Sequence, residues 1–349
     1  MKPTESKPKP EAGHRPLLAV GTFVVDYHKV INHYPNERSS SKVYREVVSN
    51  GGAPLNLLVN LANMGVDFPL VAAGKVGKDL DGTFIRDLCQ EKDIDTSQLA
   101  ADDTASTGYT DVYTVEKTGR HTCFHFSGVG DSLRRRDVKI DAVKPKMLFL
   151  GSLGALGRMD EFNEEYHRPG SAQLIRDARK KGITTIVELA PFDHETSLHN
   201  YATTIAEAEY LIVSDRTLES ITSMSLYTEN QFDPELARLA AQAIFDAGLR
   251  KALIIHAGIA ATYVGADGSF HQQVGSFLPC DQRAGSAGVD HAFCAGFLEG
   301  LYHEKPLPLC LEQGLAVAAC CRRDITPSGG ISSLKDCIES YSKLSLAKT

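Results

Sequence analysis

Short apolar runs alternate with amphipathic stretches along almost the whole chain, starting at Leu17. This alternation is typical of a mostly parallel sheet whose two faces are covered by helices. We expect core strands over residues 17–21, 70–73, 147–150, 184–189, 210–213 and 252–256. We expect helices over residues 54–64, 79–92, 171–181, 234–247, 292–302 and 309–321. The predicted fold class is therefore α/β, with three layers in the order helix, sheet, helix.

Three strand-like segments interrupt this rhythm, over residues 42–49, 109–115 and 121–126. They lie beside polar turns, so they predict a small second sheet. Because these insertions follow early strands of the core, we expect this sheet to form a lid over the strand ends, where α/β sheets bind ligands. The predicted organisation is a disordered tail over residues 1–15 and one α/β domain over residues 16–349, whose lid is formed by about residues 24–50 and 104–127.

The composition excludes several classes of protein. The 349-residue chain is 42% hydrophobic and 23% charged, which is typical of a globular protein with a sizeable core. Its formal net charge of −7 argues against a broad basic surface, so we expect no nucleic-acid partner. No apolar stretch approaches the length of a membrane span, and the N-terminal segment lacks the apolar core of a signal peptide. The eight cysteines include no C-x-x-C pair, which favours free thiols in a reducing compartment, and we expect a cytoplasmic protein.

The most informative segment is G-G-A-P-L-N-L-L-V-N-L-A-N-M-G, over residues 51–65. Its two leading glycines allow the backbone to approach a ligand closely, and the proline suits the first turn of a helix. Three asparagines fall on one face of this helix by their spacing, Asn56, Asn60 and Asn63. Two interpretations fit this pattern. The helix either turns a polar stripe to solvent or presents amide groups to a ligand.

This segment is similar to the first signature of the PfkB, or ribokinase-like, carbohydrate kinases. Residues 74–82, G-K-V-G-K-D-L-D-G, resemble the segment that follows it in that family, and the resemblance covers about residues 17–330. Asp26 stands just after the first strand, where these kinases keep a ligand of the sugar hydroxyls. The resemblance implies a ribokinase-like fold in which the sugar is bound by Asp26, Gly51, Gly52 and Asn56, beneath the small sheet.

The second half of the chain departs from the family pattern. PfkB kinases place D-T-x-G-A-G-D-A-F at the start of a late helix, where glycine N–H groups stabilise the transferred phosphoryl group and the last Asp is the base. Here residues 285–293 read G-S-A-G-V-D-H-A-F. An ungapped alignment puts His291 in the place of the base, and a one-residue insertion restores Asp290 to that place, so both stay candidates. The anion hole would consist of Ala287, Gly288 and Val289.

Other positions on the nucleotide side also differ. Residues 213–219, V-S-D-R-T-L-E, stand where the family has N-x-x-E, so Asp215 would meet the nucleotide and Glu219 would help to organise Mg²⁺. His256 and Gly258 stand where T-x-G-x-x-G would contact the nucleotide. The segment E-L-A-P at residues 188–191 replaces D-x-N-x-R. By the resemblance, the cosubstrate is ATP and the metal is Mg²⁺.

Two functions fit these observations. The first is a kinase, an alcohol-group phosphotransferase that passes the γ-phosphoryl group of ATP to a sugar or sugar-like hydroxyl. The second is a catalytically impaired relative that binds a sugar or nucleoside as a sensor or regulatory partner. The motifs are shared by kinases of several sugars and nucleosides, so they do not name the substrate. Because an exposed lid sheet has edges and an outer face that commonly pair, we expect a homodimer formed through the lid.

Overall fold

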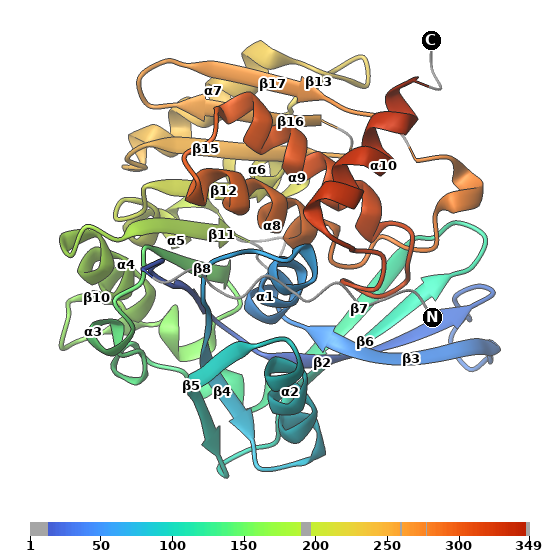
Figure 1. Ribbon diagram of the computed structural model, residues 1–349, viewed down its shortest axis with the longest axis horizontal. Helices are drawn as coiled ribbons and strands as arrows, with labels where there is room; N and C mark the ends of the chain where they lie inside the picture. Colours follow the sequence, from blue (N-terminus) through green and yellow to red (C-terminus); the bar gives the residue numbers. More distant parts are fainter. Residues whose placement is uncertain (1–12, 190–196, 259, 277, 347–349) are drawn as a thin grey trace.

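A nine-stranded sheet forms the centre of the computed structural model, which describes residues 13–189, 197–258, 260–276 and 278–346 (Figure 1). The strand order is β17-β16-β15-β12-β11-β8-β1-β4-β5. Its strands are β1 (Leu17–Val20), β4 (Leu70–Gly77), β5 (Ile94–Asp102), β8 (Met147–Leu153), β11 (Thr184–Leu189), β12 (Tyr210–Ser214), β15 (Ala252–Ala257), β16 (Ala260–Gly265) and β17 (Phe270–Val274). The strands from β15 to β5 are parallel, and β16 and β17 add an antiparallel edge.

Two helical layers enclose this sheet (Figure 1). One core cluster joins the sheet to α1 (Ala53–Met64), α2 (Leu80–Glu91), α8 (Val289–Tyr302), α9 (Leu307–Cys321) and α10 (Leu334–Leu346). A second cluster on the opposite face joins it to α3 (Ile140–Val143), α4 (Gly170–Lys180), α5 (Leu198–Ile205), α6 (Asp215–Thr222) and α7 (Pro234–Asp246). The short 3₁₀ helices are η1 (Gly128–Ser132), η2 (Arg135–Asp137), η3 (Gly157–Met159) and η4 (Cys280–Gln282). The three-layer α/β prediction is therefore confirmed.

A small sheet of four strands stands beside this core, in the order β3-β2-β6-β7. It consists of β2 (Val24–Ile31), β3 (Val43–Gly51), β6 (Gly108–Val115) and β7 (His121–Phe126). The β2–β3 and β6–β7 pairs are antiparallel, and β2 and β6 are parallel. The register sets four residues in one row across the sheet, Ser49, Asp26, Thr110 and His125. Since side chains alternate between the two faces of a strand, this row belongs to a single face. Two further hairpins are β9 (Phe162–Asn163) with β10 (Arg168–Pro169) and β13 (Tyr227–Thr228) with β14 (Gln231–Phe232).

Close packing fixes helix α8 against α9. A Cβ atom at Gly296 of α8 would come within 2.5 Å of the backbone oxygen of Gln313 in α9, so only glycine permits this approach. A Cβ atom at Gly314 of α9 would in turn meet the ring of Phe293 at 2.7 Å. The start of α8, which carries the second motif, is therefore held in place by a glycine-dependent helix contact.

All six predicted core strands and all six predicted helices are present, with shifted ends. Strand β4, for example, continues to Gly77 instead of ending at residue 73. Strands β5, β16 and β17 and helices α5, α6 and α10 were not predicted. Residues 1–12 of the predicted tail lie outside the described residues, whereas Arg15 donates hydrogen bonds to the carbonyl oxygens of Lys144 and Pro145.

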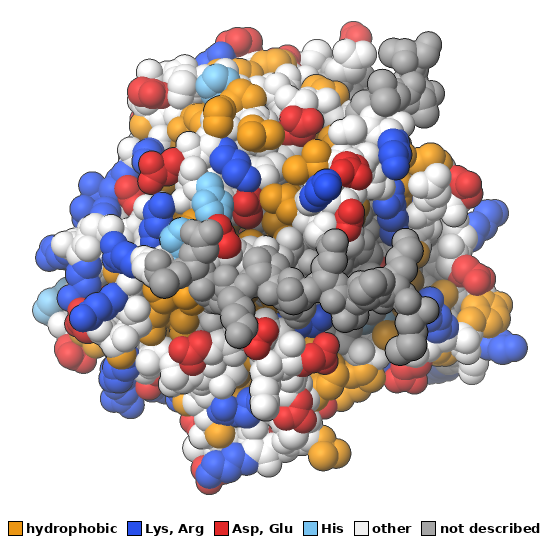
Figure 2. All heavy atoms as spheres, viewed as in Figure 1, with side chains coloured by type: hydrophobic (Ala, Val, Ile, Leu, Met, Phe, Trp, Pro, Cys, Tyr) orange, Lys and Arg blue, Asp and Glu red, His pale blue; other side chains and the backbone are white. Residues whose placement is uncertain are grey.

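Charged side chains of both signs are interspersed over the face shown in Figure 2. Within the described part of the chain, no helix combines the length and the apolar character needed to cross a membrane.

Candidate active site

The predicted sugar residues meet where β2, β3 and α1 come together. Asp26 of β2 is buried, and a Cβ atom at Gly51 would lie only 2.0 Å from its Oδ1. Gly52 precedes α1 with φ of 80°, and a Cβ atom there would meet the carbonyl oxygen of Thr22 at 2.2 Å. Its own carbonyl oxygen accepts the first helical hydrogen bond, from the N–H of Asn56. Gly51 thus leaves the space that the carboxyl group of Asp26 occupies, and Gly52 lets the backbone pass close to Thr22.

Burial raises the pKa of Asp26 to about 8, although a hydrogen bond from Thr110 works in the opposite direction. A carboxyl group with this pKa is largely protonated at neutral pH, so it both donates and accepts hydrogen bonds. Thr110 also contacts His125, with 3.0 Å between Oγ1 and Nδ1. This corner of the small sheet therefore offers neutral polar groups suited to sugar hydroxyls.

Asn56 belongs to a buried chain of hydrogen bonds that connects the sugar residues to α8. The hydroxyl of Ser328 donates to Oδ1 of Asn50 at 2.7 Å, and Nδ2 of Asn50 donates to Oδ1 of Asn56 at 2.6 Å. Nδ2 of Asn56 lies 3.2 Å from Nδ1 of His291. Asn56 is 3% exposed and Asn60 is 0% exposed, so the interpretation of this face as a solvent stripe was wrong.

The small sheet also contacts the second motif. Nδ1 of His121, on β7, lies 2.9 Å from the hydroxyl of Ser286, and that hydroxyl donates to the carbonyl oxygen of Gly119 at 3.4 Å. On the same face of the sheet, Nε2 of His28 lies 2.9 Å from the hydroxyl of Ser49. Burial lowers the pKa of His28 to about 4 and also lowers the pKa of His121. These imidazoles are therefore neutral, and the sheet reaches from Asp26 to the segment before α8.

The predicted anion hole lies at the N-terminus of α8. Gly288 is the N-cap with φ of 71°, and no side chain caps the helix. A Cβ atom at Gly288 would meet Cβ of Pro327 at 2.4 Å. Ala287 and Val289 flank it and are both 7% exposed. Since the first N–H groups of a helix have no intrahelical acceptor, this uncapped end suits an anion.

The two candidate bases on α8 have different surroundings. The side chain of Asp290 is 58% exposed, and its Oδ1 lies 3.4 Å from Nδ1 of His256, a ring that packs on Phe293. The side chain of His291 is 19% exposed, and burial lowers its pKa to about 4. Its Nε2 lies 4.0 Å from Oε1 of Glu188. Asp290 is therefore an accessible carboxylate, and His291 is a neutral imidazole.

Sequence analysis placed Glu188 at the start of the segment that replaces D-x-N-x-R but gave it no role in the site; it lies near the end of β11 and is buried. Its side chain is 5% exposed, and Oε2 accepts a hydrogen bond from the N–H of Ser152 at 2.5 Å. Burial raises the pKa of Glu188 to about 7, and the charge of Asp290 adds to that shift. The signals for a role were this place in the family pattern and a charged residue inside the apolar run at residues 184–189.

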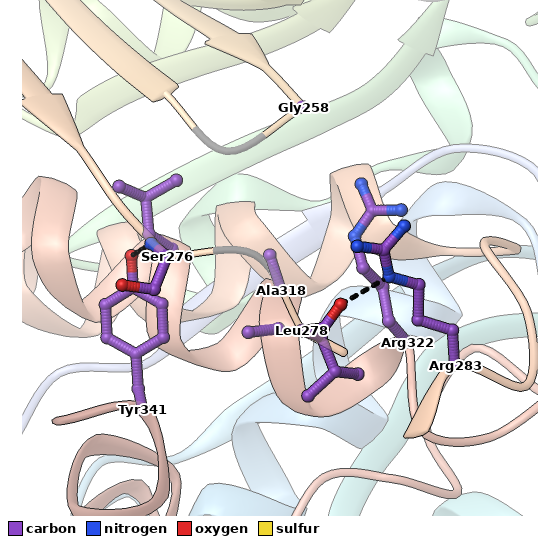
Figure 3. Close-up of a pocket in the computed structure, with 9 residues that line it drawn as sticks. Gly258, Ser276, Leu278, Arg283, Ala318, Arg322 and Tyr341 are labelled. Carbon is purple, nitrogen blue, oxygen red and sulfur yellow. Dashed lines mark hydrogen bonds between the residues drawn. The ribbon is translucent and has the colours of Figure 1, made fainter. Parts of the chain in front are cut away.

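A cavity of about 160 Å³ opens on the nucleotide side, between the β15–β16 turn and helices α9 and α10 (Figure 3). Its lining consists of Gly258, Ser276, Leu278, Arg283, Leu315, Ala318, Ala319, Arg322 and Tyr341. Nε of Arg283 donates to the carbonyl oxygen of Leu278 at 2.6 Å, and the side chains of Arg283 and Arg322 lie side by side (Figure 3). Burial lowers the pKa of Arg322, and the charge of Arg283 contributes to this shift. We call this cavity the arginine pocket; it has an apolar wall and a cationic end.

Of the predicted nucleotide residues, Gly258 lines the arginine pocket and His256 faces Asp290 instead. The two carboxylates of α6 are bound within their own segment. The hydroxyl of Tyr227 donates to Asp215, and the N–H of Leu226 donates to Oε1 of Glu219 at 2.8 Å. Across the described residues, no group of three or more His, Cys, Asp or Glu side chains is arranged to hold a metal ion.

Comparison with known proteins identifies the family of this chain. Residues 17–334 match the model of the pfkB family carbohydrate kinases. The chain therefore belongs to this family, as its motifs predicted. A 5-dehydro-2-deoxygluconokinase of Geobacillus thermodenitrificans is 25% identical over 313 residues, which cover 87% of this chain and 86% of the relative. A nucleoside kinase of Methanothermobacter thermautotrophicus is 29% identical over 132 residues, or 37% of this chain and 41% of the relative.

Solved structures of similar fold extend over nearly the whole chain. Ribokinase of Arabidopsis thaliana, in complex with ribose and ATP, superposes with a TM-score of 0.75 at 16% identity, covering 93% of this chain and 98% of that one. Phosphofructokinase-2 of Escherichia coli gives a TM-score of 0.72 at 18% identity, covering 95% of this chain and 99% of that one. The ribokinase-like fold is thus confirmed.

Proposed function

We propose that the protein transfers the γ-phosphoryl group of ATP to a hydroxyl of a sugar or a sugar-like molecule. The observation that carries this proposal is the position of the first turn of α8 between two unlike sites. His291 contacts Asn56 on the sugar side, and the charge of Asp290 acts on Arg322 in the arginine pocket. One turn of helix therefore contacts the neutral polar corner and lies within electrostatic reach of the cationic pocket, which suits phosphoryl transfer between two bound molecules.

On the sugar side, the carboxyl group of Asp26 and the hydroxyl of Thr110 would pair with sugar hydroxyls. The absence of a Cβ atom at Gly51 lets the carboxyl group of Asp26 take its place in this corner, and Gly52 lets the backbone turn beside Thr22. Asn56 acts indirectly in this proposal, because its amide oxygen accepts a hydrogen bond from Asn50 and its amide nitrogen faces Nδ1 of His291. It holds His291 in place beside the acceptor.

On the nucleotide side, the apolar wall of the arginine pocket would bind the nucleobase of ATP. The cationic end of this pocket would bind the phosphates. Guanidinium groups pair well with phosphate oxygens, and a bound anion offsets the repulsion between Arg283 and Arg322. The N–H groups that follow Gly288 would stabilise the charge on the transferred group. Ala287 and Val289 would contribute to this anion hole through their backbone groups.

The donor set available to Mg²⁺ is small. Glu219 and Asp215 are occupied by hydrogen bonds within their own segment, and Asp290 is the exposed carboxylate beside the anion hole. Mg²⁺ in kinases is held largely by phosphates and water with one or two carboxylates, so this set fits a metal that enters with the nucleotide. Asp290 would hold that ion, and Mg²⁺ would neutralise charge on the phosphates.

The small sheet would act as the lid of this site. His121 of the sheet already meets Ser286 beside the anion hole, and Asp26 and Thr110 of the same sheet form the sugar corner. A sheet that contacts both places would exclude water from the acceptor during transfer. We also propose that the protein works in the cytoplasm, because the described cysteines are free thiols.

The function is tested by titration calorimetry and by ADP release with Mg-ATP. The acceptors are 5-dehydro-2-deoxygluconate, which the curated relatives suggest, ribose, fructose and adenosine. We expect turnover with at least one acceptor and saturable binding of Mg-ATP. Binding of a sugar without any binding of ATP would contradict the kinase and favour the alternative, a regulatory sugar-binding protein.

We further propose a homodimer that pairs the outer faces of two small sheets. The register places four exposed apolar side chains on that face: Val48 at 46%, Tyr109 at 38%, Phe124 at 60% and Phe126 at 45% exposure. Contiguous exposed apolar surface of this kind marks an interaction site. A second copy of the chain fits because an identical face is complementary under two-fold symmetry.

Sedimentation of the wild type and of the double variant Phe124→Asp/Phe126→Asp tests this dimer. We expect a dimer at micromolar concentration that the double variant weakens by at least 100-fold. A wild-type monomer at that concentration would refute the pairing.

A further inference from the structure

The position where the family keeps its catalytic aspartate is filled by His291, yet a carboxyl group still reaches that position from another element. Oε1 of Glu188, on β11, lies 4.0 Å from Nε2 of His291, on α8. A gap of 4.0 Å is too long for a hydrogen bond. An oxygen atom placed about 2.8 Å from both groups bridges this gap, because hydrogen bonds of that length meet at roughly a right angle. The distance between the two atoms therefore suits one bridging hydroxyl.

The hydrogen-bond chain determines which atom of His291 carries its proton. Asn50 donates to the oxygen of Asn56, so the amide nitrogen of Asn56 is directed to Nδ1 of His291. Nδ1 then accepts, and the proton of the neutral ring resides on Nε2, facing Glu188. A hydroxyl between the two would accept from Nε2–H and donate to Oε1. This is the orientation that general-base removal of its proton needs.

Glu188 is held rigidly for this role. The N–H of Ser152 binds Oε2, and a hydrogen bond from the side chain of Ser152 also favours the ionised carboxyl group. Oε1 is the oxygen that faces Nε2 of His291. Ser152 itself adopts φ of 58°, in the left-handed region that a residue with a Cβ atom enters at a cost. Backbone strain of this kind is commonly retained at functional sites.

We propose that Glu188 is the general base and that His291 positions the acceptor hydroxyl against it; this inference rests on the proposed kinase function. The O–H bond of the sugar hydroxyl breaks and its proton passes to Oε1 of Glu188. The sugar oxygen forms a bond to the γ-phosphorus, while the bond from this phosphorus to the β-phosphate oxygen breaks and its electron pair leaves on ADP. The catalytic carboxylate thus comes from β11, whereas the family pattern places it on α8. Asp290 acts on the nucleotide side.

The electrostatics support this assignment. The groups that face Glu188 are Asp290, His291 and Cys294 on α8 and the backbone of Ser152 on β8. Burial raises the pKa of Glu188 to about 7, and the negative charge of Asp290 contributes. A base whose pKa lies near the working pH is the efficient one.

The test compares Glu188→Gln, which keeps the acceptor for Ser152 N–H but loses basicity, with the wild type on the best acceptor of the panel. We expect kcat to fall by about 10²- to 10⁴-fold, with the KM values for acceptor and ATP changed less than threefold. In the wild type, kcat/KM falls as pH drops through about 7, because Glu188 becomes protonated. This acidic limb should vanish in the variant. Glu164→Gln, on the exposed surface, is the matched control and should leave both quantities unchanged.

The outcomes separate the two proposals. Asp290→Asn should raise the KM for Mg-ATP and keep the acidic limb. Loss of the acidic limb in this variant would overturn the role of Glu188 while leaving the kinase function intact. A kcat of E188Q above one third of the wild-type value would do the same. Absence of turnover by the wild type with every acceptor would overturn both. If calorimetry shows that E188Q no longer binds the acceptor, Glu188→Asp decides instead. It keeps a carboxyl group, so it should retain the limb at a kcat about tenfold to 100-fold lower, and an unchanged kcat would overturn the proposal.

Discussion

The groups on the two sides of α8 differ in their charge and in their burial. On the sugar side, Asp26, Asn56 and Glu188 are buried and His291 is partly buried, and all four are neutral or nearly neutral groups. On the nucleotide side, two arginines converge at one end of an apolar pocket. In the proposed function, the first side would select its ligand by hydrogen-bond geometry, since a buried group left unpaired is costly, whereas the second would attract its ligand by charge.

This difference explains which parts of the family pattern the chain retains. A sugar corner made of buried, mutually hydrogen-bonded groups tolerates little change, because each partner depends on the next. A phosphate site built from side-chain cations and helix N–H groups is less dependent on the identity of any one residue. In the ungapped alignment, Val289 and Asp290 replace the family's alanine and second glycine. Val289 would contribute its backbone N–H only, whereas Asp290 adds a carboxyl group to the site.

The largest effect is expected on the nucleotide side. Changing Arg283 and Arg322 together to glutamine removes two charge-assisted contacts to phosphate, each worth about 1.5–3 kcal/mol. The KM for ATP should therefore rise by about 10²- to 10⁴-fold, while the calorimetric affinity for the sugar stays within twofold. Arg323→Gln, outside the pocket, is the matched control. Equal losses of ATP and sugar affinity would show that the two sides are not separate.

A smaller effect is expected from Gly51→Ala on the sugar side. The added Cβ atom would lie 2.0 Å from Oδ1 of Asp26, so the carboxyl group must move from its place opposite Thr110. Loss of one or two hydrogen bonds to the sugar should weaken its binding by about tenfold to 100-fold. ATP affinity should stay unchanged, and thermal unfolding should confirm a folded protein. Sugar affinity equal to that of the wild type would remove Asp26 from the site.

The two sides also differ in how well their residues could be predicted from the sequence. Gly51, Gly52 and Asn56 lie within one short motif, so their proximity follows from local helix geometry. The contact of Glu188 with His291 joins residues about a hundred positions apart, through the order of strands in the sheet, and no spacing rule predicts it. Arg283 and Arg322 likewise come from a loop and from the end of α9. Strands β16 and β17 were missed because they form an antiparallel edge that the pattern of alternating strands and helices does not require.

The smallest effect is expected on the unfolding free energy, in a comparison of the wild type with Asp26→Asn. Its pKa is raised to about 8 from 3.8, so the folded state holds a proton that the unfolded state releases above pH 4, and stability falls as pH rises toward 8. The lowered pKa values of His28 and His291, about 4, act in the opposite direction, but only below pH 6.5. Glu188 titrates in both proteins. Between pH 6.5 and 8, the unfolding free energy of the wild type should therefore fall by about 1.5 kcal/mol more than that of Asp26→Asn.

Urea unfolding at the two pH values measures this difference. The variant should also be the more stable protein at pH 8, because an amide group is buried there without the cost of ionisation. Parallel pH dependence in the two proteins would mean that Asp26 is already ionised and solvated. The sugar side would then attract its ligand by charge, as the arginine pocket does, and the contrast between the two sides of α8 would disappear.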